Sequence, residues 1–199
     1  MADCNELADF QWLIGVEAAE LAAELTTNAV PLHTAVGRLR DRLSPVRTHL
    51  LLELIESRRR AAAKFTAADR MFFTPLGLEQ ATDEWVAAYK AERLADQGPV
   101  TDLCCGIGGD FLTIAQHSPV IGVDLNPTMA HLAAANAQAV LPPEITKNVS
   151  FHIGDVESFD LHNVSAWHID PDRRPTGRRT TSLDWSSPNL ATLERMLAA

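Results

Sequence analysis

The residues with the most evident chemistry form a glycine-rich turn that joins a predicted strand to a predicted helix. The segment reads VTDLCCGIGGD over residues 100–110, so that Asp102 ends the strand and Asp110 begins the helix. Glycines at such a turn let a ligand approach the backbone closely. A phosphate normally favours a helix N-terminus, but here it would meet the like charge of Asp110. The turn therefore predicts a nucleoside ligand that carries no phosphate at this point.

The same turn separates two classes of nucleoside cofactor. The dinucleotide fingerprint G-x-G-x-x-G needs a third glycine, and Phe111 stands in its place. S-Adenosylmethionine combines a sulfonium cation, an ammonium group and a nucleoside, and Asp102 would meet the ammonium group. The sequence therefore predicts S-adenosylmethionine as the cofactor, with a NAD-dependent oxidoreductase as the alternative.

Acidic residues also follow three further predicted strands. Asp124 ends the apolar run of residues 120–123, where a carboxylate would bind ribose hydroxyls. Asp155 follows the strand predicted at residues 149–153 and would accept a hydrogen bond from an adenine amino group. Because ligands of open α/β sheets bind beyond the carboxyl ends of the strands, we expect these acids to share one rim with Asp170, which follows the fourth strand.

Together these motifs resemble those of bacterial class I S-adenosylmethionine-dependent methyltransferases that carry a THUMP-like domain downstream. The glycine turn is also similar to that of the trimethylguanosine synthase group. The resemblance runs from about residue 58 to the chain end and includes RAxxKF from Arg60, FTP from Phe73 and LEQAT from Leu78. It implies methyl transfer, and, because THUMP-like domains are associated with RNA modification, it implies RNA as the acceptor.

The resemblance further implies that the segment before the first strand closes over the cofactor, with Thr74, Gln80 and Thr82 near its methionine end. The cofactor-binding set expected from the turn, the strand ends and this segment is Thr74, Gln80, Thr82, Asp102, Cys104, Gly106, Gly108, Asp124, Leu125, Asp155, Val156 and Asp170.

The segment after the fourth strand carries the expected acceptor site, made of Asp170, Pro171, Arg173 and Arg174. In methyltransferases that act on base amines, the motif here resembles Asp/Asn/Ser-Pro-Pro-aromatic, and this chain departs from it at Asp172 and Arg173. Asp170 is the candidate general base, whereas the arginines would stack on a base or clamp a phosphate or carboxylate. Alternatively, Asp170 and Pro171 simply end a strand, and the arginines form internal salt bridges.

These motifs need an α/β sheet to bring them together. Residues 1–73 show apolar positions at helical spacing and predict an N-terminal helical bundle, in which Ser44 and Pro45 start one helix. Residues 74–199 alternate strands and helices, which predicts a Rossmann-like parallel sheet. A class I methyltransferase sheet resembles seven strands in the order 3-2-1-4-5-7-6, and only strands one to four are expected here. We therefore expect either a fragment of a longer protein or a partner or further segment that covers the fourth strand's edge.

Composition sets limits on these functions. The chain has 199 residues, is 46% hydrophobic and 22% charged, and carries a net charge of −9, which is typical of a soluble globular protein and disfavours a broad nucleic-acid surface. Three cysteines and seven scattered histidines offer no zinc spacing, so no metal is expected. Neither a signal peptide nor a membrane span is visible, and we expect a cytoplasmic protein. A non-catalytic cofactor-binding module remains a further alternative.

Overall fold

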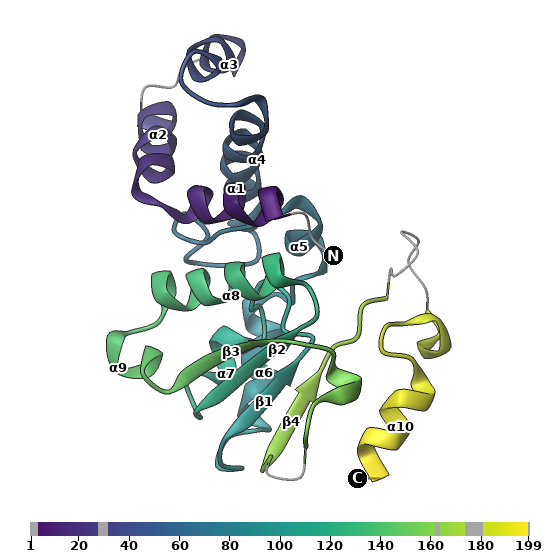
Figure 1. Cartoon of the computed structure of the whole chain (residues 1–199). Coiled ribbons are helices and arrows are strands. Elements are labelled where there is room, and N and C mark those ends of the chain that lie inside the picture. Colours follow the sequence, from purple (N-terminus) through teal and green to yellow (C-terminus); the bar gives the residue numbers. More distant parts are fainter. Residues whose placement is uncertain (1–3, 28–31, 162–163, 174–180, 199) are drawn as a thin grey trace.

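The N-terminal part of the chain is helical. The computed structural model describes residues 4–27, 32–161, 164–173 and 181–198, and Figure 1 shows their arrangement. The first described elements are α1 (Cys4–Ile14), α2 (Val16–Thr27), α3 (Leu32–Arg40) and α4 (Pro45–Ala61). The Ser44 side chain caps α4 by accepting a hydrogen bond from the Arg47 N–H, and Pro45 lies in the first turn, where proline costs no hydrogen bond.

A four-stranded parallel sheet forms the rest of the framework. Its strands β1 (Val100–Leu103), β2 (Val120–Asp124), β3 (Val149–Ile153) and β4 (Ala166–Ile169) lie in the order β3-β2-β1-β4. The sheet is preceded by α5 (Pro75–Gln80) and α6 (Glu84–Glu92). The remaining described helices are α7 (Phe111–Ile114), α8 (Pro127–Val140), α9 (Pro143–Thr146), the 3₁₀ turns η1 (Val156–Ser158) and η2 (Leu183–Trp185), and α10 (Leu190–Ala198).

The two faces of the sheet are covered very differently. One face packs on a large core that α7 and α8 share with the N-terminal helices, and Leu13, Leu51, Phe73, Phe111 and Leu132 all belong to it. In Figure 1, α8 lies between the sheet and the N-terminal helices. The division that the sequence suggests at residue 73 stays a prediction, since this core runs across it.

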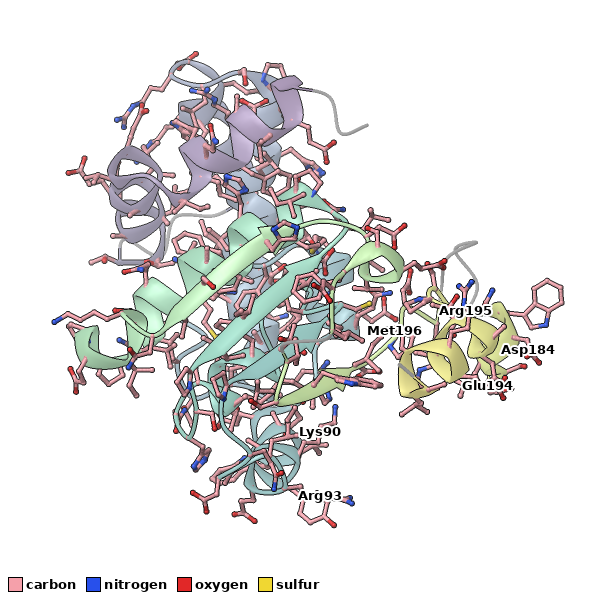
Figure 2. The ribbon with its side chains drawn as sticks, turned by 60° about the horizontal axis from the view of Figure 1, so that its bottom comes forward. Lys90, Arg93, Asp184, Glu194, Arg195 and Met196 are labelled. Carbon is pink, nitrogen blue, oxygen red and sulfur yellow. The ribbon has the colours of Figure 1, made fainter. Side chains whose placement is uncertain are left out.

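The opposite face carries a small cluster around the buried Leu103, Val123 and Val156. Met196 of α10 packs against this cluster, and Figure 2 shows Met196 on the side of α10 that is turned toward the sheet. Figure 2 also shows Lys90 of α6 and Arg93, the residue that follows α6, well apart from α10.

β4 stands at the edge of the described sheet. In the described part of the chain it pairs with β1, and no strand is paired with its other side. Beyond β4, Asp172 and Ser187 form an antiparallel bridge with two backbone hydrogen bonds of 2.9 Å. The predicted α/β class, with N-terminal helices ahead of a Rossmann-like sheet, is confirmed. Every helix in the described ranges is too short or too polar to cross a bilayer.

Candidate functional site

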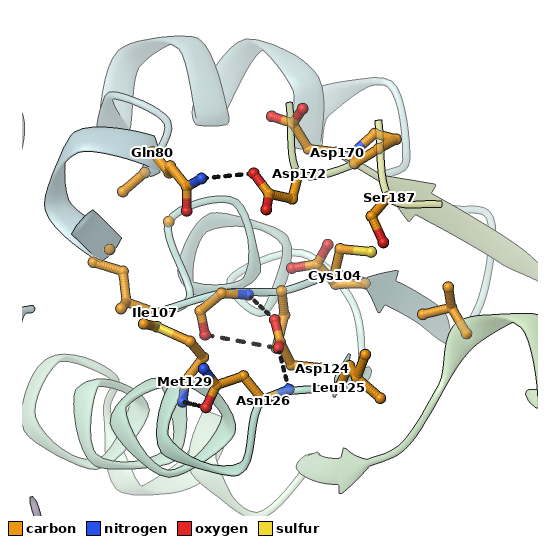
Figure 3. Close-up of a pocket in the computed structure, with 18 of the residues that line it drawn as sticks. Gln80, Cys104, Ile107, Asp124, Leu125, Asn126, Met129, Asp170, Asp172 and Ser187 are labelled. Carbon is orange, nitrogen blue, oxygen red and sulfur yellow. Dashed lines mark hydrogen bonds between the residues drawn. The ribbon is translucent and has the colours of Figure 1, made fainter. Parts of the chain in front are cut away.

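An open cleft of about 1100 Å³ lies beyond the carboxyl ends of β1, β2 and β4. Its walls are the glycine turn after β1, the end of α5, the start of α8 and the segment after β4. Figure 3 shows Gln80 and Asp172 on one side of it and Asp124, Leu125 and Asn126 on the other. The predicted residues in its lining are Gln80, Thr82, Asp102, Cys104, Gly106, Asp124, Leu125, Asp155, Val156, Asp170, Pro171 and Arg173.

The glycine turn takes a backbone course that few residues tolerate. Gly106 and Gly108 have φ angles of 55° and 92°, and Cys104 also lies in the left-handed region with φ of 62°. A side chain at Gly106 or Gly108 would therefore be strained, and the strain at Cys104 is of the kind that collects at functional sites. Gly108 itself is absent from the cleft lining, so its contribution is the shape of the turn.

Asp124 ties the end of β2 to this turn. One of its carboxylate oxygens accepts the Gly106 N–H at 2.8 Å, and the other accepts the Asn126 N–H at 2.8 Å. Burial raises the pKa of Asp124, while these two hydrogen bonds oppose the shift. A carboxylate has about four acceptor positions. Two positions therefore remain for hydroxyl donors in the cleft.

Asp102 and Asp110 each present an unsatisfied oxygen. Asp102 is 2% exposed; its Oδ1 lies 2.9 Å from Nδ1 of His168, and its Oδ2 is buried without a partner among the described residues. The Oδ2 of Asp110 accepts hydrogen bonds from Thr82 Oγ1 at 2.7 Å and from Lys90 Nζ at 3.0 Å. Its Oδ1 is likewise buried and unpartnered within the described ranges. Both residues belong to the cleft lining, where carboxylates suit a cationic ligand with N–H donors.

The two cysteines of the turn are unsuited to nucleophilic chemistry. Burial, followed by the neighbouring charges of Asp124 and Asp102, raises the pKa of Cys104 to about 12. Burial also raises the pKa of Cys105 well above its ordinary value. Since the thiolate is the reactive form, these side chains act as small packing groups.

The segment before β1 forms one wall. Gln80 donates from Nε2 to Asp172 Oδ1 at 2.7 Å, which links this wall to the segment after β4. Thr82 reaches Asp110, as described above. Thr74 is different, because its side chain caps α5 by accepting the Gly77 N–H and it is absent from the cleft lining.

The residues expected at the adenine end follow β2 and β3. Leu125 is 66% exposed at the cleft, and the buried Val156 also belongs to the lining. The Asp155 side chain accepts the Glu157 N–H at 2.9 Å and so caps η1. The structure therefore gives Asp155 a structural partner and leaves its predicted contact with adenine a prediction.

The segment after β4 forms the opposite wall. The Asp170 side chain is 42% exposed, with Oδ2 3.6 Å from Lys90 Nζ. Pro171 and the exposed Arg173 also line the cleft. Arg174 lies outside the described residues. Among the described residues, no group of three or more acidic, histidine or cysteine side chains forms a metal site.

Sequence reasoning missed several residues that hold this site together. Lys64 donates from Nζ to the carbonyls of Leu78 at 2.9 Å and Ala81 at 2.8 Å, and so fastens the wall before β1. Lys90 bridges Asp110 and Asp170. Of these two lysines, only Lys64 belongs to a motif that could have marked it in the sequence, namely RAxxKF.

Asn136 and His168 were missed as well. Asn136 is fully buried in α8 and joins the segment before α5 to the glycine turn. His168 lies on β4 beside Asp102. The partners of Asn136 are 64 and 29 residues away in the chain and that of His168 is 66 residues away, so no local pattern marks them.

Comparisons with known proteins agree with this geometry. Residues 100–169 match the family model of a methyltransferase domain. No curated protein matches the chain.

Solved structures extend the likeness. A candidate methyltransferase from Porphyromonas gingivalis W83 is 20% identical over 99% of this chain, with a TM-score of 0.63, and shows the same fold. The present chain spans 47% of the length of that protein.

Two other structures are similar over less than half of this chain. An RNA methyltransferase from Salinibacter ruber, solved with S-adenosyl-L-homocysteine, is 20% identical over 42% of this chain and 56% of its own, with a TM-score of 0.36. An amino pentose methyltransferase from Micromonospora echinaspora, solved with S-adenosylmethionine, is 33% identical over 40% of this chain and 32% of its own, with a TM-score of 0.32. The likeness to THUMP-like methyltransferases and to the trimethylguanosine synthase group stays a prediction.

Proposed function

We propose that this chain binds S-adenosylmethionine in the cleft and transfers its methyl group to an acceptor beside the segment after β4. The observation that carries the proposal is the set of carboxylate residues in the cleft lining, Asp102, Asp110 and Asp124. An ammonium group has three N–H donors and a positive charge, so it suits a cleft lined by carboxylates. The methyltransferase-domain match over residues 100–169 supports the same function.

Other described residues fit the remaining parts of the cofactor. Asp124 keeps acceptor capacity for the ribose hydroxyls, and the exposed Leu125 offers an apolar surface to the adenine ring. A dinucleotide would instead bring a pyrophosphate to the turn, where Asp102, Asp110 and Asp124 already line the cleft. The carboxylates therefore favour a cationic cofactor over NAD.

The chemistry asks little more of the protein than positioning. When bound, S-adenosylmethionine supplies a methyl group on an activated sulfonium. Fixing donor and acceptor in line is worth about 7–11 kcal/mol for well-aligned groups. Asp170 would accept the proton that the acceptor atom gives up, and its Oδ2 lies 3.6 Å from Lys90 Nζ. Pro171 and Arg173 would orient the acceptor from the same segment.

RNA is the acceptor class that we propose. The proposal rests on the resemblance to methyltransferases with a THUMP-like domain and on the exposed Arg173 at the cleft, since a guanidinium stacks on bases and binds phosphates bidentately. The alternative is a module that binds the cofactor without transferring the methyl group.

Calorimetry with S-adenosylhomocysteine tests the cofactor. We expect the wild-type chain to bind and Asp124→Ala to bind at least about tenfold more weakly, because the ribose loses a charged acceptor. Asp41→Ala, at an exposed position after α3, is the matched control and should bind as the wild type does. A wild-type chain that binds NAD but not S-adenosylhomocysteine would revive the oxidoreductase alternative.

Transfer of a labelled methyl group tests the acceptor. The chain is incubated with labelled S-adenosylmethionine and total bacterial RNA, and the same RNA digested beforehand serves as control. We expect label in the intact RNA. Label in protein or small molecules would contradict RNA as the acceptor, and binding without any transfer would favour the non-catalytic module.

A further inference from the structure

His168 is the nearest side-chain partner of the carboxylate that carries the proposed cofactor site. The β1–β4 register sets His168 directly opposite Asp102. Opposed residues of parallel neighbours point to the same face of a sheet, and here Nδ1 of His168 lies 2.9 Å from Asp102 Oδ1. The side chains are 14% and 2% exposed, so solvent screens this contact very little.

The contact with His168 occupies one of the two carboxylate oxygens of Asp102. Its Oδ1 is occupied by His168, which leaves Oδ2 as the unpartnered oxygen among the described residues. Burial raises the pKa of Asp102, whereas the hydrogen bond from His168 lowers it. An N–H donor on Oδ1 therefore both orients the carboxylate and favours its charged form.

We propose that His168 is a positioning residue for the amino-acid end of the cofactor: its hydrogen bond holds the Asp102 carboxylate at the cleft wall that receives the ammonium group. This inference rests on the function proposed above and assigns a role to a residue of β4. Since Asp170 and Arg173 follow on the same strand end, the contact also connects the acceptor wall of the cleft to the cofactor end.

The charges around His168 set the expected pH dependence. Asp102 on β1, Asp110 ahead of α7 and Lys90 on α6 all act on it. Burial alone lowers the pKa of His168, but the hydrogen bond and charge of Asp102 outweigh it, so the pKa lies above its ordinary value. Protonated His168 and a bound ammonium group are two cations that interact with the same carboxylate, so each weakens the binding of the other. By linkage, affinity for the ammonium ligand rises as pH rises through the pKa of His168.

Two ligands separate this role from a merely structural one. S-Adenosylhomocysteine carries the ammonium group, and 5′-methylthioadenosine is the same nucleoside thioether without the amino-acid end. For His168→Phe we expect S-adenosylhomocysteine affinity to fall about ten- to a hundredfold, the range for a hydrogen bond to a charged group. Affinity for 5′-methylthioadenosine should stay within about twofold. His152→Phe on β3, at an exposed position outside the cleft lining, is the control.

A second variant distinguishes the loss of the hydrogen bond from a loss of folding. His168→Gln keeps an N–H donor and should recover part of the affinity, while the part of the pH slope of S-adenosylhomocysteine binding that comes from the titration of His168 should be absent in both variants. Equal losses for both ligands, or unchanged S-adenosylhomocysteine affinity in folded His168→Phe, would overturn the positioning role. A wild-type chain that binds neither ligand would instead refute the proposed function itself.

Discussion

Replacement of Asn136 by alanine should loosen the connection between the helical part and the glycine turn. Its side chain is fully buried in α8. Oδ1 accepts the Phe72 N–H at 2.6 Å, and Nδ2 donates to the carbonyls of Phe72 at 3.1 Å and Ile107 at 2.8 Å. Asn136→Ala removes all three hydrogen bonds at once and leaves three backbone groups without these partners.

The expected loss follows from these contacts. Each hydrogen bond contributes a net of about 0.5–1.5 kcal/mol, and a buried group left unsatisfied costs about 1–3 kcal/mol. Because water will reach some of the exposed groups, we expect a loss of about 2–5 kcal/mol in the free energy of unfolding. That is a large share of the roughly 5–15 kcal/mol typical of a folded domain.

Urea denaturation followed by tryptophan fluorescence measures this loss. With a slope of about 2 kcal/mol/M, the midpoint should fall by about 1–2.5 M. Asn136→Asp keeps the acceptor for Phe72 but turns a charge toward two carbonyl oxygens, so it should cost as much as alanine. Asn148→Ala, at an exposed position, is the control and should change the midpoint little. A loss below about 1 kcal/mol for Asn136→Ala, or a harmless Asn136→Asp, would refute the reasoning.

Three further results are expected. Arg173→Ala should weaken acceptor use in the methyl-transfer assay and leave S-adenosylhomocysteine affinity nearly unchanged, since Arg173 is exposed in the segment after β4; a fall in cofactor affinity would contradict its place at the acceptor. Lys64→Met removes the donor to the carbonyls of Leu78 and Ala81, so hydrogen exchange of residues 78–82 should accelerate, and unchanged exchange would count against this anchor. Cys104, with its pKa raised to about 12, should resist iodoacetamide at pH 8 in the folded chain, as peptide mass spectrometry would show, whereas rapid labelling would mean an accessible thiolate.

Local sequence was sufficient to predict the framework of the site. The glycine turn at residues 106–108 and the acids Asp102 and Asp124 follow from spacing alone, because a strand end and a left-handed turn are made by neighbouring residues. The start of α4 at Ser44 and Pro45 is local in the same way. The parallel sheet also follows, since alternating strands and helices leave few other arrangements.

Tertiary structure alone decided what those residues touch. Asp102 contacts His168 because β4 lies beside β1 in one particular register. The hydroxyl oxygen of Thr74 accepts a hydrogen bond from the Gly77 N–H at the start of α5. Lys64 finds its carbonyl partners only after the chain turns back on itself. The physical reason is that a hydrogen bond depends on distances of a few tenths of an ångström between segments far apart in the chain, whereas local pattern reports only which face or turn a residue occupies.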